Sequence, residues 1–277
     1  MLINEVINKI KKQCAGYGRI DDDKTRDKVL FGSTDRECSG IVFCLWATKD
    51  VIEKAHKQGA NLIISHEALF WNHGDHTDWL EESNNQTYSM KKSLLDKYEL
   101  TVWRLHDYIH SGIEVEDGKI QDGIFYGLAK KLSWSKYLTF EKPFTASFNI
   151  PKSSANKVID YVLNRLNLKE AREIGSLNHD VTKIVIPFHI LDQANEEIKA
   201  INNENIGLLI TMEMNDFTLA QYVYDNSDFT GKTAILSLGH FNVEQPGMEF
   251  AAYYFGKLLD ININFLDIGD YYNYINI

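Results

Sequence analysis

The sequence of 277 residues lacks most features of secreted, membrane-embedded and nucleic-acid-binding proteins. Its only cysteines are Cys14, Cys38 and Cys44, an odd number without a C-x-x-C pair, which argues against a disulfide framework and a thiolate zinc site. No apolar run approaches the ~18 residues of a membrane span, and no charged segment followed by an apolar one begins at Met1. We therefore expect a cytoplasmic protein that is neither secreted nor membrane-spanning.

Positive charge is also scarce. The chain has 29 Lys and Arg against 39 Asp and Glu, a formal charge of -10, and no basic run. Generic binding to a phosphate backbone is therefore not expected, although a local metal-filled pocket can still take an anionic ligand. The 44% of hydrophobic and 12% of aromatic residues are ordinary for a globular protein, and the length suffices for one large domain or two lobes.

The order of apolar segments predicts an α/β fold. Residues 40–46 and 61–65 resemble buried strands, and they flank a helix at 49–58 that Thr48 can cap. Such a βαβ unit implies parallel strands with a right-handed crossover. The pattern continues with helices at 88–98, 123–132, 154–166, 191–201 and about 245–259, and with strands at 100–105, 183–187, 206–211 and 233–238.

Alternating residues at 137–150, together with Pro143 and Pro151, predict edge-type strands around a lobe boundary. This boundary divides the chain into an N-terminal α/β lobe, 1–137, and a C-terminal α/β lobe, 138–277.

Histidines follow buried strands at three places, where the ligands of open α/β sheets gather. The three clusters are Ser65-His66-Glu67, His106-Asp107-Tyr108-Ile109-His110 and Gly239-His240-Phe241-Asn242-Val243-Glu244. Imidazole and carboxylate together suit zinc, iron, manganese or nickel. Six candidate ligands exceed the need of one tetrahedral zinc, so two metal ions that share them fit better.

Each cluster alone has an ordinary alternative. A His-Glu pair after a strand is often surface decoration, His-x-x-x-His occurs by chance, and Glu244 also suits the N-terminal dipole of a helix. His73 and His76 either line the mouth of the site or belong to a solvated loop. The recurrence at three strand ends favours a functional site.

The same segments resemble the Nif-three-like dinuclear metal-centre proteins. Gly59-Ala60-Asn61-Leu62-Ile63-Ile64-Ser65-His66-Glu67-Ala68-Leu69-Phe70 is similar to the family signature Gly-Ala-Asp-Leu-Ile-Ile-Thr-His-His-Pro-Leu-Phe. Residues 106–110 fall on its His-Thr-Asn-Leu-Asp signature, and residues 239–247 on its closing Gly-His-x-x-x-Glu-x-Pro-Gly. Residues 208–214 are similar to its Leu-Ile-Thr-Gly-Glu-Met.

Two departures from the signatures compensate each other. Glu67 stands where the family usually has its second histidine, and His110 stands where it has an aspartate. The resemblance therefore implies metal ligands at His66, Glu67, His106, His110, His240 and Glu244. Asp107 is either a further ligand or the group that orients an imidazole. The family's Asp-Asn-x-Gly-Leu motif is not evident in residues 21–33, and Asn215, Asp216 and Phe217 replace its histidines after Glu-Met-Lys.

The resemblance implies two α/β lobes with a dinuclear site between them, two divalent ions (zinc, iron or manganese), and a homohexameric ring. It also implies the activity named in this family, that of type-two GTP cyclohydrolases. The simplest function is then metal-dependent hydrolysis, in which a metal-bound hydroxide attacks a small, anionic substrate.

In this mechanism Glu213 is the candidate catalytic proton shuttle, although a carboxylate at a helix N-terminus explains it as well. The alternatives are a non-catalytic metal-binding or regulatory assembly, and an ordinary α/β protein with surface histidines.

Overall fold

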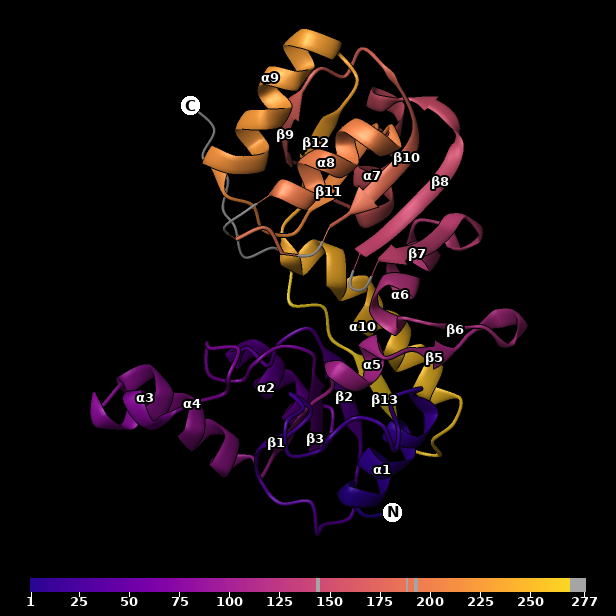
Figure 1. The fold of residues 1–277 in the computed structure, drawn as a ribbon. Helices are drawn as coiled ribbons and strands as arrows, with labels where there is room; N and C mark the ends of the chain where they lie inside the picture. The colour runs from indigo at the N-terminus through magenta and orange to yellow at the C-terminus, as the bar shows by residue number, and fades with distance from the viewer. Residues whose placement is uncertain (143–144, 188, 192–193, 270–277) are drawn as a thin grey trace. The chain divides into compact units, whose positions relative to one another are not determined.

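The structure, a computed structural model, describes residues 1–142, 145–187, 189–191 and 194–269 (Figure 1). The chain forms two compact units. Unit 1 comprises Met1–Gly127 and Gly247–Ile277, and unit 2 comprises Leu128–Pro246. Each unit contains its own β-sheet together with α-helices, so the predicted α/β fold class is confirmed. Compactness does not define a folding domain, and the lobe boundary at residue 137 stays a prediction.

Unit 1 is built on a five-stranded sheet in the order β1-β4-β3-β2-β13. Its strands are β1 Val29–Phe31, β2 Ile41–Cys44, β3 Leu62–Ser65, β4 Thr101–Arg104 and β13 Ile263–Phe265. All neighbours pair in parallel except β1, which is antiparallel to β4. The predicted βαβ unit is confirmed, because helix α2, Lys49–Lys57, joins β2 to β3 and Thr48 caps it by accepting a hydrogen bond from the Val51 amide.

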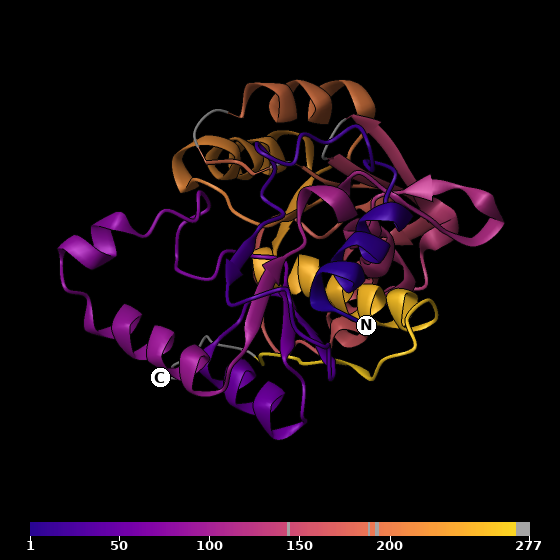
Figure 2. The same ribbon diagram turned by 90° about the horizontal axis from the view of Figure 1, so that it is seen from below.

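Helices cover both faces of this sheet. Val42 and Cys44 of β2 pack in one core with α2 and with α4, Gln86–Lys97, while Phe43 points the other way and stacks on Phe255 with ring centroids 6.0 Å apart. Figure 2 shows α2 and α4 on one side of the strands and α1, Ile3–Gln13, on the other. Unit 1 also contains α3 Asp78–Glu82, α5 Asp107–His110, β5 Ile113–Glu114, η1 Glu116–Gly118, β6 Ile120–Gln121 and α6 Gly123–Lys131, whose last turn belongs to unit 2.

Unit 2 is built on a six-stranded sheet in the order β7-β8-β10-β11-β12-β9. Its strands are β7 Leu138–Lys142, β8 Thr145–Ser154, β9 Arg172–Gly175, β10 Asp180–Ile186, β11 Leu208–Thr211 and β12 Ala234–Ser237. The central strands β10, β11 and β12 are parallel, so their carboxyl ends lie at one edge. The other pairings are antiparallel.

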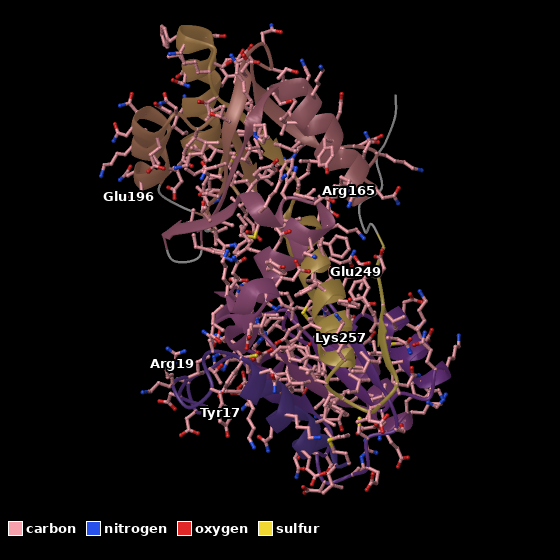
Figure 3. The ribbon with its side chains drawn as sticks, turned by 90° about the vertical axis from the view of Figure 1, so that its right-hand side faces the viewer. Tyr17, Arg19, Arg165, Glu196, Glu249 and Lys257 are labelled. Carbon is pink, nitrogen blue, oxygen red and sulfur yellow. The ribbon has the colours of Figure 1, made fainter. Side chains whose placement is uncertain are left out.

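The helices of unit 2 are α7 Ala155–Leu166, α8 Asn195–Glu204, α9 Gln221–Thr230, η2 Ser135–Tyr137 and η3 Asp216–Ala220. Leu209 and Ile235 share a core with Ile201 of α8 and Val223 of α9. Near the end of α7, Arg165 donates through Nε to the carbonyl of Lys131 at 2.8 Å, and Figure 3 marks its position.

Three local expectations differ from the structure. The helix predicted from residue 245 begins earlier, as α10 His240–Gly256, and runs through Pro246. Residues 17–36, whose polar sequence predicts a loop or an irregular segment, contain β1. The strand predicted to end at residue 150 continues through Pro151 as β8, and it pairs with both β7 and β10 instead of lying at an edge. Its pairing with β10 is irregular next to Pro151, and Pro143 lies outside the described residues. Across the described part of the chain, no helix has both the length and the apolarity needed to cross a bilayer.

Candidate metal centre

Unit 1 brings three of the expected ligands together, and we call them the three-histidine group: His66, His106 and His110. His66 follows β3 and His106 follows β4, and these strands are parallel neighbours, with Ser65 opposite Arg104. His110 is added by α5, a single helical turn that starts after His106 and closes with a hydrogen bond from the His110 amide to the His106 carbonyl at 3.1 Å. Ring centroids of the three side chains lie 4.6, 5.1 and 5.0 Å apart.

Hydrogen bonds set the tautomer of each ring in the three-histidine group. Nδ1 of His66 lies 2.9 Å from the Leu105 carbonyl, which can only accept, so this nitrogen donates. Nδ1 of His106 donates in the same way to Asp107 at 2.8 Å, and Nδ1 of His110 to Asp122 at 2.7 Å. In a neutral ring the lone pair then lies on Nε2, the arrangement of metal-binding histidines held by an outer carboxylate or carbonyl.

Burial favours the neutral form of the central ring. Burial, together with the nearby rings of His66 and His110, lowers the pKa of His106 to about 3 in spite of the hydrogen bond to Asp107, which opposes the shift. Burial alone would raise the pKa of Asp107, but hydrogen bonds from His106, Arg26 and Thr25 bring it below its ordinary value. The hydrogen bond to Nδ1 of His106 is the contact that the second of the two expected roles of Asp107 requires.

Two carboxylates behind the three-histidine group were not among the sequence candidates. Asp27 is buried and accepts hydrogen bonds from the amides of His106, at 2.9 Å, and Asp107, at 2.7 Å. Asp122 accepts from His110 with one oxygen and caps α6 with the other, through the amide of Ile124. An Asp directly before an apolar helix is a cap signal that points to Asp122, whereas nothing near Asp27 in the sequence indicates its role.

Glu67 lies beside this group. Its donor atom and that of His66 lie within 4.8 Å of each other. One oxygen, Oε2, is held by Arg104 at 3.1 Å. Arg104 was also missed, although an arginine in an apolar strand segment is itself a signal, because arginine is almost never fully buried unless it is paired. His73 lies at the edge of the group, with its ring centroid 5.4 Å from that of His106.

Unit 2 contains a second group, which we call the His-Glu-His group: His189, Glu213 and His240. Each residue follows one of the parallel strands β10, β11 and β12, so the shared strand edge brings them together. One oxygen of Glu213 lies 2.5 Å from Nδ1 of His189, and the other lies 2.5 Å from Nδ1 of His240. His189 was missed by the sequence reasoning, although the rule that found the other histidines, a histidine after a buried strand, also applies to it.

The start of α10 positions the remaining expected ligands. His240 and Glu244 are one turn apart, and Nε2 of His240 lies 2.6 Å from Oε2 of Glu244, whose side chain is buried. Burial would raise the pKa of Glu213, but the hydrogen bonds from His189 and His240 outweigh it and lower the pKa to about 2. Glu213 is therefore a carboxylate at neutral pH and a fixed acceptor for both rings.

The expected ligands come from both units. His66, Glu67, His106 and His110 belong to unit 1, whereas His240 and Glu244 belong to unit 2 together with Glu213. Within each unit three imidazole or carboxylate donors lie within 4.8 Å of one another, so each unit has a candidate metal-binding group of its own.

Comparisons with known proteins bear on the fold and the family of the chain. No curated protein shows significant similarity to the chain. Among solved structures, the hypothetical protein SA1388 of Staphylococcus aureus has 14% identity and a TM-score of 0.71, over 99% of each chain. The Bacillus cereus protein related to NIF3 has 14% identity and a TM-score of 0.67, over 100% of this chain and 99% of that chain. Reduced HcgD from Methanocaldococcus jannaschii has 15% identity and a TM-score of 0.67, over 97% and 98%.

At such identities these structures support the fold alone. The family model for Duf34/NIF3 (NGG1p interacting factor 3), by contrast, matches residues 1–269, and it confirms the resemblance found in the sequence motifs. Since this match covers nearly the whole chain, the protein belongs to the Duf34/NIF3 family.

Proposed function

We propose that the protein binds two divalent metal ions and uses them to hydrolyse a small anionic substrate. The proposed ligands are His66, Glu67, His106, His110, His240 and Glu244. The three-histidine group is the observation that carries the proposal. The ions are expected to be zinc, iron or manganese, which accept imidazole and carboxylate together.

The donor chemistry of the three-histidine group fits a cation. Each of the three rings already donates through Nδ1 to a carbonyl or carboxylate, so each neutral ring presents a lone pair on its other nitrogen. Their donor atoms lie within 4.8 Å of one another, and such lone pairs repel unless a positive charge lies among them. A proton suits this place poorly, because burial disfavours the charged form of His106.

Bound divalent ions would supply Lewis acidity and lower the pKa of water. Four positive charges against Glu67 and Glu244 leave an excess of about +2, which favours anionic substrates. Nucleotides are included among these, since the family resemblance implies an activity like that of type-two GTP cyclohydrolases.

Proton transfer is the proposed task of the His-Glu-His group. Glu213 holds Nδ1 of His189 as the carboxylate of a catalytic triad holds its histidine, so the second nitrogen of His189 can exchange a proton with substrate. Glu213 also holds Nδ1 of His240, whose Nε2 lies against Oε2 of Glu244, and we propose that an ion takes the place of the proton between these two atoms.

Metal content tests the binding part of this proposal. Purified protein is expected to hold two ions per chain by elemental analysis, and His106→Ala and His240→Ala are expected to hold fewer. His56→Ala is the matched control, because His56 of α2 stacks on Tyr98 at the end of α4 and belongs to neither ligand group. Fewer than one ion per chain in the unaltered protein contradicts the proposal.

Turnover is tested with a panel of phosphoesters, nucleotides including GTP, and cyclic amides. The expected result is a metal-dependent activity that His240→Ala and Glu244→Ala abolish and His56→Ala leaves unchanged. Two bound ions without turnover on any of these substrates would favour a non-catalytic metal-binding or regulatory assembly instead. We further propose a cytoplasmic homohexamer, and light scattering on the purified protein measures the number of subunits.

A further inference from the structure

Arg104 has an environment that its place in a strand does not require. It is the last residue of β4, and its side chain is fully buried, with 0% exposed. A guanidinium carries five N–H donors and cannot lose its charge in a protein, so burying it demands acceptors in every direction.

Within the described part of the chain, the acceptors of the Arg104 side chain belong to one loop, residues 66–75, which follows β3. Nε donates to the carbonyl of His66 at 2.9 Å. One terminal nitrogen donates to the carbonyl of His73 at 2.9 Å and to Oδ2 of Asp75 at 2.8 Å. The other donates to Oε2 of Glu67 at 3.1 Å and lies 3.3 Å from Nδ1 of His73. The single side chain therefore fixes both ends of the loop that carries His66 and Glu67.

The backbone of this loop is shaped for the contact. Asp75 has a positive φ of 57°, a left-handed conformation that is uncommon outside glycine but tolerated by Asp. In this conformation it presents its carboxylate to the guanidinium, with only 13% of the side chain exposed. Two carboxylates, Glu67 and Asp75, thus neutralise one buried cation.

We propose that Arg104 positions Glu67 as a metal ligand, and that the Arg104–Glu67 pair does in this chain what a second histidine does in the family signature. A carboxylate can bind a metal through one oxygen or both. Because Arg104 already takes one lone pair of Oε2, the proposed coordination is through Oε1, so that a single oxygen takes the place of a single imidazole nitrogen. This inference rests on the proposed metal site, and in it Arg104 does not bind the metal itself but orients the ligand Glu67.

A double-mutant comparison of metal binding separates this role from a merely structural one. Zinc and manganese are titrated into metal-free protein by calorimetry for the unaltered chain, Arg104→Met, Glu67→His, and the double variant. Outer residues that orient metal ligands change affinity by roughly 10–100-fold. We expect Arg104→Met to weaken one of the two ions by that factor. In the Glu67→His background the same substitution is expected to change affinity less than about 2-fold, as for independent sites.

Matched variants guard against loss of the fold. Asp75→Asn removes the other carboxylate partner of Arg104 but leaves the contact to Glu67, so metal affinity should stay within about 2-fold. Arg104→Lys keeps the charge but lacks the planar fork of donors, and it gives the same two-background comparison if Arg104→Met does not fold. The visible spectrum of cobalt-substituted protein adds a readout of the ligand set, and it should change with Arg104→Lys only while Glu67 is present.

Equal losses of affinity with and without the Glu67→His substitution would overturn the inference, because Arg104 would then act only by holding the loop 66–75 in place and not through Glu67. An unchanged or higher affinity of Arg104→Met would overturn it as well, since the cation would then only repel the metal. Failure of the proposed function is seen separately, as an unaltered protein that binds fewer than one ion per chain.

Discussion

Lys91 of α4 is a buried amine that contacts the loop after β3, and the free-energy cost of its charge can be tested. Its ammonium group donates to the carbonyl of Leu69 at 2.6 Å and lies 5.6 and 5.5 Å from the ring centroids of Phe70 and Trp71. Burial lowers the pKa of Lys91 from 10.5 to about 8. Charging this amine therefore costs folding free energy that an apolar side chain of similar length would not, and Lys91→Met removes that cost.

The sign of the pH dependence follows from linkage. Below pH 8 both the folded and the unfolded chain carry the proton, so the cost is fully present, whereas between pH 8 and 10.5 the folded chain loses it first and becomes relatively more stable. With these two pKa values the cost is about 3 kcal/mol at pH 7 and about 1 kcal/mol at pH 9.5. Loss of the hydrogen bond to Leu69 offsets about 1–2 kcal/mol of the gain at either pH.

Urea unfolding of the unaltered protein and of Lys91→Met at pH 7 and pH 9.5 measures this difference. We expect the variant to be more stable by about 1–2 kcal/mol at pH 7, and its advantage to shrink by about 2 kcal/mol at pH 9.5. Lys92→Met is the matched control, because Lys92 is exposed, pairs with Glu81, and has a raised pKa, so its smaller effect has the opposite sign. A difference between Lys91→Met and the unaltered protein that does not change with pH would refute the reasoning.

Three further outcomes are expected. Gly247→Ala should lower the free energy of unfolding by about 1–3 kcal/mol in urea titrations, because a new Cβ would lie 2.5 Å from Cα of Ile124, and an unchanged midpoint would contradict this packing. Asp122→Ala should destabilise the protein by about 1 kcal/mol through loss of the α6 cap, and should weaken zinc binding by roughly 10–100-fold through His110, whereas normal zinc affinity would exclude the second effect. Zinc at about 100 times its dissociation constant should stabilise the folded chain by about 2.7 kcal/mol, measured by thermal unfolding with and without chelator, and equal melting temperatures would count against a bound ion.

The sequence was informative where one local pattern decides the structure. The buried runs around Phe43 and Ile63, with a capped helix between them, predicted the βαβ unit correctly because parallel strands of an α/β sheet are apolar on both faces. The buried runs at 61–65 and 100–105 located His66 and His106 in the same way, since neighbouring parallel strands end at one edge. The predicted start of α10 was too late, because a proline such as Pro246 usually stands in the first turn of a helix, whereas this helix continues through it.

Long-range partners were beyond reach of such patterns. Asp27 accepts from the amide of His106 because β1, which follows Asp27, pairs with β4, and Arg104 donates to acceptors in a loop some thirty residues earlier in the chain. Neither contact leaves a periodic or spacing signal, because each depends on how the strands are ordered in space. His189 differs in this respect, because its place shortly after a buried strand is visible in the sequence, as it is for His66 and His106.

The discontinuous make-up of unit 1 has a consequence for biosynthesis. Its sheet is completed only by β13, which adds in parallel to β2 after more than two hundred intervening residues. During translation the first 127 residues must therefore wait, with one sheet edge unpaired, until Phe265 leaves the ribosome, while the inserted unit has already emerged in full. Nascent chains stalled before this strand should accordingly be captured by chaperones that bind exposed strand edges.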